Sequence, residues 1–358
     1  MQQEQSTDQS SQGFITAINK LILIIIILVA ALVTIPVVLY IKSKPANPKE
    51  ENATAPVVTA EAKKNTSNYW IAPDISSITD TKQKELAEYG KELIAHTAKY
   101  LGPNGSVLKI SNGLNCQNCH LQAGTAVFGN NYGSVASLYP KFRARSGATE
   151  NIYKRVNDCF ERSLNGKALD TAGKEMQAIV SYINFLGSNV AKGTKAAGSG
   201  FKELAFLDRA ADPIKGAAVY TARCQSCHQQ DGQGLLTPDK TEYSFPALWG
   251  KSSYNDGAGL FRISNFARYV KYNMPQGATH ENPQLTDEEA WDVAAFVNTQ
   301  PRPHINVPKD WPDKSKKPID HPFGPYADQF NEKQHKYGPF KPIEAEQKKT
   351  AQIKKGTT

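Results

Sequence analysis

Several residue types are scarce in this chain. Its 358 residues include only five cysteines and three methionines, and runs with the apolar alternation of a strand are few. The shortage of strand patterns predicts an all-α fold. The net charge of +8 is not gathered into a long basic tract or a nucleic-acid motif. The charge therefore argues against nucleic acid as a partner and fits an anionic substrate or an acidic protein better.

Four of the five cysteines fall into two copies of one short pattern. Residues 116–120 (CQNCH) and 224–228 (CQSCH) both read Cys-x-x-Cys-His, the attachment motif of c-type haem. Zinc or redox sites also use Cys-x-x-Cys, but neither requires histidine directly after the second cysteine. The sequence therefore predicts two covalently bound c-type haems with their iron. The attaching thiols are Cys116, Cys119, Cys224 and Cys227, and the iron-binding histidines are His120 and His228.

Only one long uncharged apolar run is present, from Leu21 to Tyr40. About 20 such residues span a bilayer, although a buried core helix is an alternative. A cleavable signal peptide is the stronger rival, but it would be shorter and followed by Ala-x-Ala, whereas Ile-Lys-Ser-Lys follows here. We expect a short cytoplasmic N-terminus at residues 1–20 and an uncleaved transmembrane anchor at residues 21–41.

The charges that flank this run do not decide its orientation. Lys42, Lys44 and Lys49 follow it and only Lys20 precedes it closely, so the positive-inside rule weakly favours the opposite orientation. Because c-type haem is attached outside the cytoplasm, we expect the rest of the chain to be periplasmic. The expected location is the bacterial cytoplasmic (inner) membrane, with a single span.

Beyond the anchor the composition divides the chain into four parts. Residues 42–68 have no apolar period and are expected to be a flexible linker. A diverged repeat then predicts two cytochrome c-like domains, 69–197 and 198–300, each with a helix, a haem motif and a closing helix. The closing helices are expected at 174–186 and 286–298, where Tyr182 and Phe296 hold equivalent places. Residues 301–358 are expected to form an irregular wrap, disordered from Glu344.

The second haem has a clear candidate for its distal ligand. Met274 lies in a short loop between the second motif and the second closing helix, where it can reach the distal face of the iron. Core filler is the alternative for a lone methionine. Met176 shares a face with Ile179 and Ile183 inside the first closing helix, so we expect it to be a core residue. The first haem then lacks a methionine ligand.

A cysteine occupies the corresponding stretch of the first domain. Residues 150–164 (ENIYKRVNDCFERSL) have a helical pattern, and Arg155, Cys159 and Ser163 recur every four residues on one face. A thiolate is a soft ligand and a nucleophile, while arginine offers forked donors for an oxyanion. A small buried cysteine is the alternative. We expect Cys159 to ligate the first haem, and the basic run KFRARSG (141–147) to help attract a small sulfur oxyanion.

Five stretches together carry a family resemblance. GLNCQNCHLQAGT, RVNDCFERSLNG, FPALWG followed by NDGAGL, NMPQG and PFGPYADQF resemble the thiosulfate dehydrogenase family of dihaem cytochromes c. The similarity extends from about residue 70 to about residue 343. The resemblance implies an enzyme that joins two thiosulfates into tetrathionate, in some members reversibly. Electrons would leave through the haems to a cytochrome c or a terminal oxidase.

The resemblance also implies roles for individual residues. His120 and Cys159 match the ligands of the family's catalytic haem, and His228 and Met274 match those of its second haem. The family's substrate-site residues match Arg145, Arg155 and Ser163. Some members have an exchangeable lysine before the methionine, where this chain has Asn273. The rival interpretation is a non-enzymatic dihaem electron-transfer subunit, as in cbb-type oxidases, which would use methionine at both haems.

The anchor hypothesis predicts how the protein fractionates. The full chain should sediment with membranes, and deletion of residues 1–68 should release a soluble form that retains both haems, because the charge-free run and the linker precede the globular part. Fractionation followed by haem staining measures this. Full-length protein that becomes soluble after cleavage near residue 41 would identify the run as a signal peptide instead.

Overall fold

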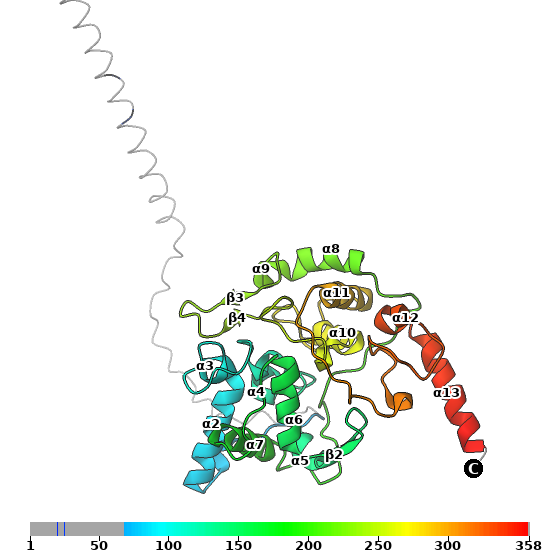
Figure 1. Cartoon of the computed structure of the whole chain (residues 1–358). Coiled ribbons are helices and arrows are strands. Elements are labelled where there is room, and N and C mark those ends of the chain that lie inside the picture. The colour runs from blue at the N-terminus through cyan, green and yellow to red at the C-terminus, as the bar shows by residue number, and fades with distance from the viewer. Residues whose placement is uncertain (1–19, 21–24, 26–67, 357–358) are drawn as a thin grey trace, which may run out of the picture. The chain divides into compact units, whose positions relative to one another are not determined.

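The computed structural model describes residues 20, 25 and 68–356 (Figure 1). The chain divides into two units, 1–65 and 66–358, and almost all described residues belong to the second. The expected cytoplasmic segment 1–20, anchor 21–41 and linker 42–68 lie almost wholly outside the described residues. Within the described ranges, no helix is both long and apolar enough to cross a membrane.

Helices dominate the second unit, as the sequence predicts. The α-helices are α2 (Thr81–Ala95), α3 (Thr97–Leu101), α4 (Leu121–Gly124), α5 (Val135–Leu138), α6 (Ile152–Asp158), α7 (Lys174–Leu186), α8 (Pro213–Arg223), α9 (Gln225–His228), α10 (Ile263–Asn273), α11 (Asp287–Thr299), α12 (Glu332–Tyr337) and α13 (Lys341–Gly356). A π-helical turn, η3 (Cys159–Ser163), continues α6.

Short strands and tighter turns complete the unit. Two antiparallel ladders pair β1 (Lys141–Arg143) with β2 (Ala148–Glu150), and β3 (Leu235–Leu236) with β4 (Tyr243–Phe245). The 3₁₀ turns are Ile75–Ser77, Cys116–Asn118, Gly259–Phe261 and Lys314–Lys316. Both ladders are too short to form a layer, so the all-α prediction holds for the architecture.

Side-chain caps begin the helices where the sequence indicates. The Asp212 carboxylate accepts from the backbone N–H of Ile214 at 2.8 Å, and Pro213 occupies the first helical position of α8. Thr286 and Glu289 form a capping box at α11, with hydrogen bonds of 3.1 and 2.7 Å. These caps satisfy N–H groups that the first helical turn would leave without partners.

Each domain is closed by one helix crossing over another at a glycine. In the first domain α2 crosses α7, and a Cβ added to Gly90 would lie 2.0 Å from the Ala178 carbonyl oxygen. In the second domain α8 crosses α11 (Figure 1), and the Cβ at Gly216 would lie 1.9 Å from the Asp292 carbonyl oxygen. Only glycine allows backbones to approach this closely.

The glycine crossings also confirm the internal repeat. In the first domain, a Cβ added to Gly90 would also lie close to the Cβ of Tyr182. In the second domain, a Cβ added to Gly216 would lie similarly close to the Cβ of Phe296. These are the two residues that the sequence pattern predicts to be equivalent. The haem motif follows α8 directly in the second domain, whereas α3 and residues 102–115 separate α2 from the motif in the first.

Each domain has its own apolar core. Met176 is completely buried among Leu93, Ile94 and Ile179, which confirms its prediction as a core residue. In the second domain Trp291 is the largest fully buried side chain. Its indole N–H donates to the Ala205 carbonyl at 2.9 Å, so this ring is held at both its apolar and its polar end.

Residues 341–356 form a helix, so the prediction of disorder from Glu344 is wrong for the described residues. Helix α13 extends to Gly356 because Phe340 and Ile343, 3% and 0% exposed, insert into the core of the second domain. Lys348 and Glu344 then form an i,i+4 ion pair at 3.1 Å along the exposed face. The sequence pattern missed the helix because only its first turn is apolar.

The helix crossings predict an unusual response to alanine. Replacing Gly90 or Gly216 by alanine should raise helix propensity yet destabilise the protein by about 1–3 kcal/mol, because the methyl group has no space. Gly259→Ala is the matched control, since the added Cβ would meet nothing within 4 Å among the described residues. Denaturant unfolding measures the difference, and a Gly90→Ala variant as stable as the wild type would contradict this packing.

Candidate functional site

The first haem motif opens onto a cavity of about 320 Å³. The two motif thiols, His120 and the side chain of Cys159 all line it, so the structure brings together the residues that the sequence assigns to haem 1. We call it the haem 1 cavity. Its apolar wall consists of side chains from α2, α5, α6, η3 and α7 and from the loop before the first motif, namely Ile94, Leu114, Val135, Leu138, Ile152, Val156, Phe160, Ile179 and Ile183. A mostly apolar cavity with a few polar groups suits a cofactor.

His120 is prepared to bind a metal through one ring nitrogen. Its Nδ1 lies 2.6 Å from the Asn130 carbonyl oxygen, so Nδ1 carries the proton and donates it, and Nε2 keeps its lone pair. The ring stacks on Tyr132, with 4.5 Å between centroids. Burial lowers the pKa of His120 to about 4, which keeps the imidazole in the neutral form that ligates iron.

Cys159 lies where α6 changes to the π-helical turn η3. Asn151 caps the start of α6 by accepting from the backbone N–H of Lys154 at 2.9 Å. One turn before the thiol, Arg155 donates from Nη1 to Cys159 Sγ at 3.2 Å. The interaction with Cys159 holds the pKa of Arg155 above its usual range, so a charged guanidinium lies against the sulfur.

The structure brings only part of the expected substrate site to this pair. Arg155 and Ser163 line the haem 1 cavity with Cys159. Arg145 instead lines a second cavity, where its Nη1 donates to the Gly257 carbonyl at 3.1 Å and its Nε lies 3.9 Å from Asp310. Burial, with a contribution from nearby Arg162, lowers the pKa of Arg145 to about 10.

Two basic residues of the haem 1 cavity were not assigned from the sequence. Arg143 and Lys195 line it together with Arg155, which makes the cavity wall strongly positive. Arg143 belongs to the basic run at residues 141–147 and ends β1, whereas Arg145 lies in the turn after β1 and lines the second cavity. Lys195 comes from the connection after α7 and carries no local signal.

The second haem motif has the same arrangement of its histidine. His228 Nδ1 lies 2.8 Å from the Pro246 carbonyl oxygen, which again leaves Nε2 for a metal, and burial lowers the pKa of His228. Cys224 and Met274 both pack against the core of the second domain, and Met274 directly follows α10 as its C-terminal cap. Helix α10 thus determines where Met274 lies relative to this core.

The two haem regions are joined by a direct polar contact. Tyr269, on α10 of the second domain, donates its hydroxyl to the carbonyl oxygen of Asn118, inside the first haem motif, at 2.7 Å. The donor side chain is 7% exposed. Tyr269 lies five residues before Met274, so this contact links the first haem motif to the helix that Met274 caps.

The residues present fit two c-type haems. Each motif supplies two thiols and a neutral imidazole whose Nε2 is left for a metal, and the first also faces an apolar cavity in which the Cys159 sulfur lies among basic groups. A chain with two such motifs in two helical domains is a dihaem cytochrome c, and its cofactors are two c-type haems.

Comparison with known proteins supports the assignment to the dihaem cytochromes c and indicates a family within that class. Residues 108–191 match the family model for the SoxA/TsdA cytochrome c domain, and residues 214–301 match that for cytochrome c. The chain is 37% identical over 244 residues to the thiosulfate dehydrogenase of Psychrobacter arcticus, covering 67% of this chain and 71% of that protein. It is 40% identical over 223 residues to that of Allochromatium vinosum, covering 61% and 81%.

A solved structure shows the same similarity. The thiosulfate dehydrogenase (TsdBA) from Marichromatium purpuratum matches with a TM-score of 0.61 and 31% identity, over 70% of this chain and 52% of that one. This chain therefore spans about half the length of that structure. On these matches the protein belongs to the thiosulfate dehydrogenase family.

The placement of Met274 predicts its effect on the second haem. Met274→Gly should lower the reduction potential of haem 2, because loss of a thioether ligand removes a group that favours the reduced iron. Met176→Leu is the matched control: it removes a thioether of similar volume from the core of the first domain and should leave both potentials unchanged. Spectroscopic redox titration measures this, and an unchanged Met274→Gly curve would exclude Met274 as the ligand.

Proposed function

We propose that this protein oxidises two thiosulfate ions to tetrathionate at Cys159 and passes the two electrons released to its haems. The observation that carries this proposal is the 3.2 Å contact from Arg155 to Cys159 Sγ inside the haem 1 cavity. It places a sulfur nucleophile and an anion-binding group side by side. Membership of the thiosulfate dehydrogenase family supports the choice of substrate.

Charge attracts the substrate to this cavity. Thiosulfate is a dianion, and a thiolate would repel it. Arg155, Arg143 and Lys195 surround the same space and offset that repulsion, because electrostatic interactions are stronger in a water-poor cavity than in solvent. Ser163 adds a hydroxyl that can donate to a sulfonate oxygen. Ligation of haem 1 by His120 and Cys159 belongs to the same proposal.

The sulfur chemistry balances in two steps at Cys159. In the first, an S–S bond forms between the thiolate and the terminal sulfur of thiosulfate, giving Cys–S–S–SO₃⁻, and two electrons leave. In the second, the terminal sulfur of another thiosulfate attacks the outer sulfur of that S–S bond. The bond to Cys159 breaks, tetrathionate departs, and the thiolate is regenerated. Arg155 stabilises the thiolate at the start and end of the cycle.

The arrangement of the two domains is consistent with electron transfer from haem 1 to haem 2 and then out of the protein. Each haem iron, when bound, can take up one electron. The Tyr269–Asn118 hydrogen bond joins the first haem motif to α10, which ends at Met274. We infer delivery from the second domain to a cytochrome c or a terminal oxidase, at the periplasmic face of the cytoplasmic membrane. The same chemistry run backwards would make the protein a tetrathionate reductase.

Removal of the thiol or of the guanidinium should have separable effects. Cys159→Gly should abolish tetrathionate formation and remove the thiolate signature of oxidised haem 1, because both depend on the sulfur. Arg155→Ala should keep that signature but lower thiosulfate turnover about a hundredfold, because the loss of one preorganised donor costs roughly this much. Thiosulfate-dependent ferricyanide reduction and low-temperature EPR spectroscopy measure the two effects.

Lys154→Ala is the matched control for Arg155→Ala. Lys154 is the neighbouring cation on α6, pairs with Asp158 and is half exposed, so its loss should leave turnover within about twofold of the wild type. Both haems should stay attached in every variant, as a pyridine haemochrome assay shows. If Cys159→Gly oxidises thiosulfate at the wild-type rate, the protein is better described as a dihaem electron carrier.

A further inference from the structure

The wider winding of the π-helical turn η3 changes the partners of its backbone carbonyls. If α6 continued as an α-helix, each carbonyl would accept from the N–H four residues later. Instead, the Cys159 carbonyl accepts from the N–H of Leu164, five residues later, at 2.9 Å. The turn ends at Ser163, so the carbonyls of Glu161 and Arg162 need donors from outside a regular helix.

One asparagine of the second domain supplies donors to both of these carbonyls. Asn255 donates from Nδ2 to the Glu161 carbonyl at 2.8 Å and from its backbone N–H to the Arg162 carbonyl at 3.1 Å. Its amide also donates to Asn165 Oδ1, just beyond the turn, at 3.0 Å. Because Asn255 is only 1% exposed, loss of these hydrogen bonds would leave buried groups without partners.

The loop that carries Asn255 is itself held in one shape. The Asn255 side-chain oxygen accepts from the backbone N–H of Gly257 at 3.1 Å, as in an Asx turn. This loop packs closely on η3, since a Cβ added to Gly257 would lie 3.1 Å from Arg162 Nη1. The amide of Asn255 therefore has a fixed orientation, with its oxygen towards its own loop and its nitrogen towards η3.

The same turn carries two side chains of the haem 1 cavity. Cys159 begins η3 and Ser163 ends it, and both line that cavity. Between them, Arg162 points the other way and donates at 2.8 Å to Asp310, which lines the second cavity. Hence η3 forms part of the wall between the two cavities. A change in its winding would move the sulfur relative to the rest of the haem 1 cavity.

We propose that Asn255 is a positioning residue for Cys159: from the second domain, it holds η3 in its π-helical winding and so keeps the sulfur beside Arg155. The meaning of this position for catalysis rests on the proposed function. The inference gives a physical role to residues 255–260 (NDGAGL), which supply no side chain to the lining of the haem 1 cavity among the described residues. The site in the first domain is then complete only when the second domain is packed against it.

Asn255→Ser in the full-length holoprotein tests this role. A serine hydroxyl can still accept from the Gly257 N–H and keep the loop, but it is too short to reach the Glu161 carbonyl. The four motif thiols are bound to haem, which leaves Cys159 as the free thiol. Iodoacetamide should alkylate Cys159 about tenfold faster in this variant, because opening of the turn no longer breaks a buried hydrogen bond. Peptide mass mapping measures the rate.

The same variant should alter haem 1 and the kinetics in a specific way. In low-temperature EPR spectra of the oxidised protein, part of the thiolate signal of haem 1 should be replaced by a second signal, while the haem 2 signal stays unchanged. The kcat for thiosulfate oxidation should fall about tenfold with KM within about twofold of the wild type, because the sulfur is displaced while Arg143, Arg155 and Lys195 lie on segments other than η3.

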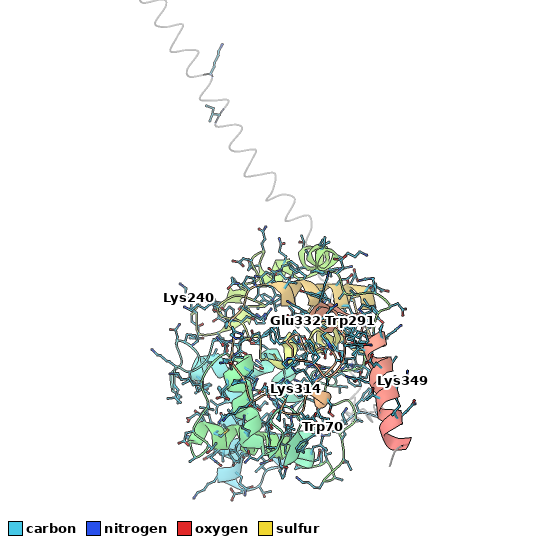
Figure 2. The ribbon with its side chains drawn as sticks, turned by 45° about the vertical axis from the view of Figure 1, so that its right-hand side comes forward. Trp70, Lys240, Trp291, Lys314, Glu332 and Lys349 are labelled. Carbon is cyan, nitrogen blue, oxygen red and sulfur yellow. The ribbon has the colours of Figure 1, made fainter. Side chains whose placement is uncertain are left out.

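Asn298→Ala is the matched control. Asn298 lies on α11, the helix that carries Trp291 (Figure 2), is 6% exposed and donates to the Phe261 carbonyl at 3.1 Å. These contacts all lie within the second domain. The control should lower the midpoint of thermal unfolding, as loss of a buried hydrogen bond does, yet leave the alkylation rate and the EPR signals at their wild-type values.

A second variant keeps the test decisive if Asn255→Ser fails to fold. Asn165→Gly removes one acceptor of the Asn255 amide at a position with φ of 42°, which glycine tolerates, and it should speed the alkylation of Cys159 by a smaller factor, about threefold. Wild-type alkylation rates in Asn165→Gly and in folded Asn255→Ser, or equal changes in Asn298→Ala, would overturn the proposal. Because alkylation needs no thiosulfate, this outcome is separate from that of the proposed function.

Discussion

The close approach of two helix backbones at a glycine is the contact on which each domain depends. Gly90 against Ala178 and Gly216 against Asp292 leave no room even for a methyl group. In the second domain α8, which makes this contact, runs directly into the Cys-x-x-Cys-His motif, whereas in the first domain α3 and residues 102–115 lie between α2 and the motif. The crossing therefore fixes the core against which each motif is placed. The functional groups are positioned by this backbone geometry rather than by local propensity.

The chemistry of the first domain follows from a helix that changes its winding. Helix α6 ends in the π-helical turn at Cys159, and irregular turns of this kind are frequent at functional sites. Arg155, Cys159 and Ser163 all line the haem 1 cavity. Arg162, in the same turn, points to the opposite side and binds Asp310. A single short segment thereby provides the thiolate, its counter-charge and the wall that separates two cavities.

The C-terminal extension is part of the architecture of both domains. Trp311 hydrogen-bonds to the backbone of Arg145 in the first domain, while Phe340 and Ile343 complete the core of the second. Together with Arg145 and residues 256–262, the extension also encloses the second cavity, of about 260 Å³. Because Arg145 is held there, positive charge extends from the haem 1 cavity across η3 to the C-terminal segment.

The sequence by itself determined the features that depend on residue type and short spacing. These are the two haem motifs, the helix caps at Asp212 and Thr286, the core position of Met176, and the shared face of Arg155, Cys159 and Ser163. Only the tertiary structure decided which long-range neighbours meet. It assigned Arg143 and Lys195, rather than Arg145, to the haem 1 cavity, and it showed that Ile343 anchors a terminal helix. Such contacts join residues far apart in the chain, so no local pattern of apolar or charged residues specifies them.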